Sequence, residues 1–151
     1  GSIDRRGFIA GAVAGALALA GCTSGPPTAA DTGTDRVRAQ VAADEASLIA
    51  QYATTIAALP QLAASLQPIM QEHQAHLAAV GAGATESATP AGQPPGSPDQ
   101  ALAALADAER AAAQQRREAC VASGDAELAR ILALIAASEA AHVPALGEIR
   151  A

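Results

Sequence analysis

Apolar residues recur every three or four positions along four segments of the chain, and this spacing places them on one face of an α-helix. The first such series is Val37, Val41, Leu48, Tyr52, Ile56 and Leu59. The third segment is so rich in Ala that its apolar face is poorly defined, although Ala is the strongest helix former. The pattern predicts four helices, over residues 34–58, 60–80, 98–122 and 125–149.

Prolines, glycines and capping residues mark the ends of these helices. Pro60 suits a first helical turn and therefore separates the first helix from the second. Ser97-Pro98-Asp99-Gln100 combines an N-cap with proline in the first turn, which predicts the start of the third helix. Ser123-Gly124-Asp125 ends that helix and caps the fourth. These short turns predict two helical hairpins.

The connection between the hairpins, residues 81–97, is long and rich in Pro and Gly. Bundles whose helices alternate in direction use short loops, whereas a bundle with one crossover needs a long one. Seventeen extended residues reach ~55 Å, and a twenty-residue helix is ~30 Å long, so the loop can return along the whole bundle. The predicted fold is an all-α four-helix bundle of two hairpins joined by a crossover.

Composition and charge exclude some functions. Hydrophobic residues make up 50% of the chain but aromatic residues only 1%, which suits closely packed helices. The net charge is −6, and no basic patch interleaves with aromatic residues, so nucleic-acid binding is excluded. We expect Arg110, Arg116 and Arg117 to lie on a solvent-exposed face.

The N-terminal residues predict export from the cytoplasm. Arg5-Arg6 precedes an apolar run, Phe8–Ala18, which is shorter than the ~20 residues that span a bilayer. Leu19-Ala20-Gly21-Cys22 follows and resembles the lipobox of bacterial lipoproteins. The paired arginines with the following Phe8 and Ile9 resemble the twin-arginine export motif; an ordinary secretion signal is the alternative.

The lipobox resemblance implies cleavage before Cys22, a diacylglycerol on its thiol and often a third acyl chain on the new amino terminus. Two or three acyl chains hold a protein on a bilayer where one is marginal. Residues 1–21 are then the export signal, 22–33 a flexible tether that contains Gly25-Pro26-Pro27, and 34–151 the bundle. The expected location is the outer face of the cytoplasmic membrane. The chain also resembles small Ala-rich actinobacterial lipoproteins.

Polar residues interrupt the apolar stripes in all four predicted helices. They are candidate metal ligands because carboxylates and imidazoles bind divalent ions. Counted from the turns, the polar residues face each other within each hairpin, whereas a crossover should offset the two hairpins by several ångströms. The candidates are Glu45, Glu72, His73, His76, Glu109, Glu139 and His142.

This arrangement resembles the ferritin-like superfamily. In its di-iron members two helices each supply one Glu, and the other two each supply Glu-x-x-His. The resemblance implies that Glu45 and Glu109 are the single carboxylates and that Glu139-x-x-His142 is one of the motifs. The second helix offers Glu72-His73-Gln74-Ala75-His76 instead, which leaves a His-rich site for one divalent ion as the alternative to a di-iron centre.

Two classes of function follow. In the first, the buried polar residues satisfy one another and hold the helices in register, and the protein is a non-catalytic accessory subunit that docks on another envelope protein. In the second, it is a ferritin-like metal-binding or metal-oxidising protein. The sequence has no Ser/His/Asp set, Gly-rich phosphate loop or Cys-x-x-Cys motif. It therefore favours the first class, with no enzymatic activity or cofactor assigned.

Overall fold

The computed structural model describes residues 29–81 and 96–150, and within these ranges every regular element is a helix. The all-α prediction is confirmed for this part of the chain. The elements are α1 (Ala29–Ala58), the short 3-10 helix η1 (Pro60–Leu62), α2 (Ala63–Val80), α3 (Pro98–Ala122) and α4 (Ala126–Glu148).

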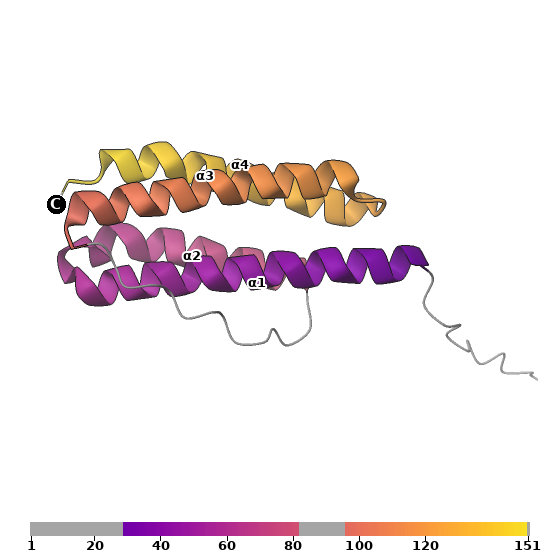
Figure 1. Ribbon diagram of the computed structural model, residues 1–151, viewed down its shortest axis with the longest axis horizontal. Coiled ribbons are helices and arrows are strands. Elements are labelled where there is room, and N and C mark those ends of the chain that lie inside the picture. Colours follow the sequence, from indigo (N-terminus) through magenta and orange to yellow (C-terminus); the bar gives the residue numbers. More distant parts are fainter. Residues whose placement is uncertain (1–28, 82–95, 151) are drawn as a thin grey trace, which may run out of the picture.

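The four helices pack as two antiparallel pairs laid one on the other (Figure 1). α1 packs along α2 and α3 packs along α4, while α1 also contacts α3 and α2 contacts α4. Leu66 near the start of α2 and Leu102 near the start of α3 share one apolar cluster with Leu146 near the end of α4. α2 and α3 therefore run in the same direction.

Two apolar clusters close the two ends of the bundle. Burial of each large apolar side chain contributes ~1.5–3 kcal/mol to folding. A layer of buried polar side chains lies between the two clusters. The first cluster contains Tyr52, Leu62, Leu66, Ile69, Leu102, Leu105 and Leu146. The second contains Val41, Val80, Leu128, Leu132 and Ile135.

Local contacts confirm several of the predicted helix ends. The Ser97 hydroxyl accepts a hydrogen bond from the backbone N–H of Gln100 at 3.3 Å. Asp125 Oδ1 accepts one from the N–H of Leu128 at 2.6 Å. Gly81 ends α2 with a φ of 64°, a left-handed conformation that glycine adopts at little cost.

One predicted boundary is wrong. α1 begins at Ala29 rather than at Thr34, so residues 29–33 are helical and do not belong to the tether. Local propensity did not predict this extension, because α1 here includes Asp31, Thr32 and Gly33, which are weak helix formers. The export signal, Cys22, the rest of the predicted tether and residues 82–95 of the predicted loop lie outside the described residues.

Among the described helices, α4 has the length and composition that could also cross a membrane. In the bundle it contributes Leu128, Leu132 and Ile135 to one apolar cluster and Leu146 to the other. These four residues are thus accounted for by the core, whereas Leu134 of the same helix is exposed.

Candidate metal centre

Every helix contributes polar side chains to the layer between the two apolar clusters. These side chains lie on the buried faces because they occupy the same helical stripes as the core residues. Four carboxylate or imidazole side chains are completely buried, Glu45 from α1, His73 from α2, Glu109 from α3 and Glu139 from α4. His142 from α4 is 5% exposed.

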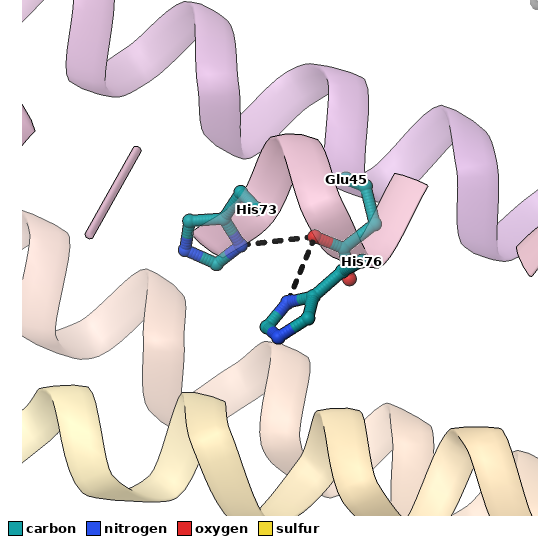
Figure 2. Close-up of side chains that lie close together, drawn as sticks. All are labelled: Glu45, His73 and His76. Atoms are coloured by element: carbon teal, nitrogen blue, oxygen red, sulfur yellow. Dashed lines mark hydrogen bonds and ion pairs between the residues drawn. The ribbon is translucent and has the colours of Figure 1, made fainter. Parts of the chain in front are cut away.

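His73 is the central residue of the layer. Its Nδ1 lies 2.9 Å from Glu45 Oε2, within the first hairpin, as the sequence predicts. Its Nε2 lies 2.8 Å from Glu109 Oε1, in the second hairpin. Figure 2 shows His73 and His76 both directed at the Glu45 carboxylate, with His76 Nδ1 3.6 Å from Oε2.

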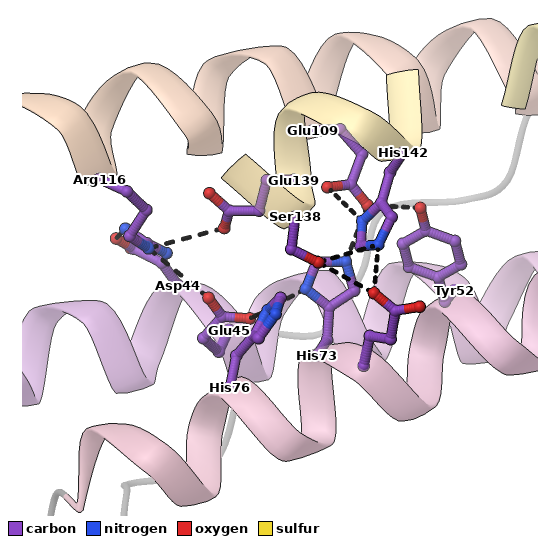
Figure 3. A network of polar contacts seen from close by, with 11 residues as sticks. Asp44, Glu45, Tyr52, His73, His76, Glu109, Arg116, Ser138, Glu139 and His142 are labelled. Carbon is purple, nitrogen blue, oxygen red and sulfur yellow. Dashed lines mark hydrogen bonds and ion pairs between the residues drawn. The ribbon is translucent and has the colours of Figure 1, made fainter. Parts of the chain in front are cut away.

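His142 and Glu109 form the other half of the layer (Figure 3). His142 Nδ1 lies 3.2 Å from Glu109 Oε2, and His142 Nε2 lies 3.0 Å from Glu72 Oε2. The Tyr52 hydroxyl donates a hydrogen bond to Glu109 Oε1. The Ser138 hydroxyl donates one to Glu72 Oε2 at 2.9 Å. Glu72 itself lies at the rim, with 56% of its side chain exposed.

Two groups of side chains in this layer could hold a metal ion, and they share His73. One is Glu45, His73 and His76, and the other is His73, Glu109 and His142. In each group one ligand atom per residue lies within 4.8 Å of the others.

The second group has the more complete surroundings. Metal-binding histidines usually donate their other N–H to a carboxylate, which fixes the ring. In the second group Glu45 lies against the outer nitrogen of His73, and Glu72 lies against the outer nitrogen of His142. Tyr52 donates to Glu109 Oε1, which leaves Oε2, the oxygen that contacts His142 Nδ1, without a hydrogen bond. Each of the three ligands is therefore oriented by a further side chain.

Within the described part of the chain, eight buried side-chain atoms lack a hydrogen-bond partner, and all belong to this layer. Each such atom ordinarily costs ~1–3 kcal/mol. Because most of them are carboxylate oxygens and imidazole nitrogens, a cation would stabilise them. The atoms are Glu45 Oε1, His76 Nδ1, Glu109 Oε2, Arg116 Nε and Nη2, Glu139 Oε1 and Oε2, and His142 Nδ1.

At the centre of the layer, the pKa values of His73 and Glu109 shift in the direction opposite to the effect of burial. Burial by itself would lower the pKa of His73, but hydrogen bonds to Glu109 and Glu45 and their negative charges raise it to about 9. Burial would raise the pKa of Glu109, but its close contacts with His142 and His73 lower it to about 2. Without metal, His73 is therefore a cation between two carboxylates at neutral pH.

The pKa of Glu139, by contrast, shifts in the direction that burial favours. Burial raises its pKa well above the ordinary value, the charge of Arg116 works against this, and the charges of Glu45 and Glu109 raise it further. The pKa of Glu45 is lowered instead, because its contacts with His73 and His76 overcome the effect of burial. One proton on Glu139 thus limits the buried negative charge when no metal is bound.

The structure brings six of the seven predicted residues together, whereas Glu139 lies beside Arg116 and belongs to neither group that could hold a metal ion. The predicted depth of the residues also needs one correction. The expected offset between the hairpins is absent, because His73 and Glu109 are in direct contact. His73 follows the first residue of α2 by ten residues, and Glu109 follows the first residue of α3 by eleven. Since both helices start at the same end of the bundle, the two side chains lie at the same level.

The prediction for Arg116 is wrong. Arg110 and Arg117 are exposed as expected, but Arg116 is 1% exposed and lies within the polar layer. The signal was its spacing, since Arg116 follows Glu109 by seven residues, two helical turns, and therefore shares its face.

A second signal lay in the motif on α2. His73-x-x-His76 has the same spacing as Glu139-x-x-His142, with His in place of the first Glu. The shared spacing indicates that His73 and His76 on α2 correspond to Glu139 and His142 on α4.

Fold and site together define a helical bundle with buried Glu and His groups that could hold a metal ion. Comparisons with protein-family models, with curated proteins and with solved structures each found no match to this chain.

Proposed function

We propose that this protein binds a divalent transition-metal ion through His73, Glu109 and His142. The observation that carries the proposal is that these three buried ligands converge while a further side chain holds each of them in place. Side chains that hydrogen-bond to metal ligands in this way strongly affect the affinity for the metal.

The donor set fits such an ion. Two imidazoles and one carboxylate are the ligands of many catalytic zinc sites and of non-haem Fe(II) sites, both of which keep open positions. The 3.2 Å between His142 Nδ1 and Glu109 Oε2 is close to the ~3.4 Å expected between neighbouring ligands around a tetrahedral zinc ion. A bound ion would supply Lewis acidity or, for iron and copper, redox chemistry.

A ferritin-like relationship and a lipid anchor belong to the same proposal. The parallel course of α2 and α3 supports a ferritin-like topology, in which one long connection returns along the bundle. The lipobox motif ending at Cys22 supports an acyl anchor on the outer face of the cytoplasmic membrane. Docking on another envelope protein stays a prediction from the sequence.

Metal should raise the stability of the bundle. We expect Zn²⁺ or anaerobic Fe²⁺, added to chelator-treated full-length protein at 100 times its Kd, to increase the free energy of unfolding by ~2.7 kcal/mol. His142→Ala should abolish this metal-dependent gain, because it removes one of three ligands. The measurement is urea unfolding followed by circular dichroism, with and without metal.

Glu148→Ala is the matched control, since Glu148 is an exposed carboxylate on the same helix. This variant should keep the full metal-dependent gain. A wild-type transition that is insensitive to Zn²⁺, Fe²⁺, Cu²⁺ and Mn²⁺ would contradict the proposed function and leave the polar layer as a device for helix register.

The anchor makes a separate prediction. Cys22→Ala should prevent acylation, so that the protein leaves the membrane fraction or remains uncleaved, whereas wild-type protein should sediment with membranes and carry a diacylglycerol by intact mass. Replacing Arg5-Arg6 by two lysines should block export if the twin-arginine route is used. An intact mass that retains residues 1–21 with unmodified Cys22 would refute the anchor.

A further inference from the structure

Arg116 is a buried cation that the proposed ligand set does not use. It lies on α3 two turns after Glu109, with 1% of its side chain exposed. Its Nη1 donates a hydrogen bond to Asp44 Oδ2 at 3.0 Å, at the rim of the layer. The rest of the guanidinium extends inward between the two hairpins (Figure 3).

Two completely buried carboxylates converge on one nitrogen of this guanidinium. Arg116 Nε lies 3.5 Å from Glu45 Oε1 on α1 and 3.6 Å from Glu139 Oε1 on α4. Within the described residues, neither oxygen of Glu139 has a hydrogen-bond partner. An ion bound by both carboxylates would lie ~2.1 Å from an oxygen of each, so it would compete with the positively charged guanidinium for these oxygens.

The charges of the buried side chains favour one divalent ion beside Arg116. The completely buried carboxylates are Glu45, Glu109 and Glu139, which carry three negative charges when ionised. One guanidinium and one divalent ion carry three positive charges and neutralise them. A second divalent ion beside Arg116 would leave an excess of two positive charges in the buried layer, which is strongly unfavourable. Without Arg116 the excess is one charge, and Asp44, which now pairs with Arg116 at the rim, can offset it.

His73 can be a ligand to one ion only, so a second ion would depend on Glu45 and Glu139. Both groups that could hold a metal use this residue. A neutral imidazole offers one lone pair, and its other nitrogen carries a hydrogen. If His73 Nε2 binds an ion with Glu109 and His142, its Nδ1–H donates to Glu45 instead of binding a second ion.

We propose that the guanidinium of Arg116 takes the place of a second metal ion between Glu45 and Glu139, and so makes the centre mononuclear. The inference rests on the proposed metal-binding function and deepens it. Arg116 is thus a specificity-determining residue, because it sets how many ions the bundle accepts while touching none of the three proposed ligands.

The test is the number of zinc ions per chain. Chelator-treated full-length protein is titrated with Zn²⁺ by calorimetry, and the metal content is measured after gel filtration. We expect one ion for wild type and two for Arg116→Met, which keeps the volume but removes the charge. Arg116→Lys keeps the positive charge and should therefore bind one ion, as wild type does. The control Arg117→Met, at an exposed neighbouring position, should also bind one.

Loss of a buried cation could prevent the metal-free variant from folding, so Arg116→Met and Arg116→Gln are also purified with Zn²⁺ present. Either variant carrying two ions supports the inference. Two ions on wild type, or one ion on both folded variants, would overturn it while leaving the metal-binding function intact. A wild-type chain that binds no zinc contradicts the proposed function and the inference together.

Discussion

Replacing Glu109 by alanine should destabilise the metal-free bundle by about 3–5 kcal/mol, the usual cost of removing one partner from a buried ion pair. The Glu109 carboxylate accepts the Tyr52 hydroxyl and lies 2.8 Å from His73 Nε2 and 3.2 Å from His142 Nδ1. Its loss would leave three buried groups without their partner and one side of protonated His73 uncompensated. The same substitution should abolish the stability gained with metal.

Urea unfolding in the presence of a chelator measures this effect. Glu118→Ala is the control, because Glu118 is an exposed carboxylate on the same helix, and it should change stability by less than about 0.5 kcal/mol. Glu109→Gln should fall between the two, since it keeps an acceptor for Tyr52 but removes the charge. If Glu109→Ala unfolds at the same urea concentration as Glu118→Ala, the polar layer contributes little to folding.

The stability of the metal-free protein should fall by about 3 kcal/mol between pH 6.5 and 9 through His73 alone. The pKa of His73 rises from 6.5 in the unfolded chain to about 9 in the folded protein. Its contribution is therefore fully present below pH 6.5 and is lost as the pH rises through 9. The raised pKa of Glu139 acts in the same direction.

Acid should also destabilise the protein. The pKa of Glu109 is lowered from 4.5 to about 2, so its contribution is present above pH 4.5 and is lost as the pH falls through about 2. Urea unfolding at several pH values, with chelator present, gives both limbs. His73→Gln should reduce the alkaline fall by the His73 contribution, because glutamine does not titrate; an unchanged slope in this variant would show that His73 is neutral in the folded protein.

The helices were predictable because helix formation depends on local spacing. Apolar residues three and four positions apart required helices, and the local hydrogen bonds of Ser97 and Asp125 placed the starts of α3 and α4 where the sequence predicts them. The start of α1 was less predictable, because the helix continues back through Asp31, Thr32 and Gly33, which are weak helix formers. Strong local signals therefore set the elements, and weak ones left a boundary open.

The candidate residues were also predictable, but their partners were not. The positions of Glu139 and His142 on the apolar stripe of α4 identified both side chains as buried. The same spacing did not reveal that Glu139 lies beside Arg116 while His142 lies beside Glu109. Helical periodicity determines which face a side chain occupies, whereas its partner depends on how the neighbouring helices are placed and rotated.

By itself, the sequence determined four amphipathic helices and a set of Glu and His residues on their buried faces. Only the tertiary structure decided that the two hairpins meet at the same depth, that His73 joins them, and that Arg116 lies inside. The physical reason is that two helices starting at the same end of a bundle bring residues of similar count to the same level. A buried arginine must pair with carboxylates, and Arg116 finds them on other helices, in Asp44 and Glu45 on α1 and Glu139 on α4.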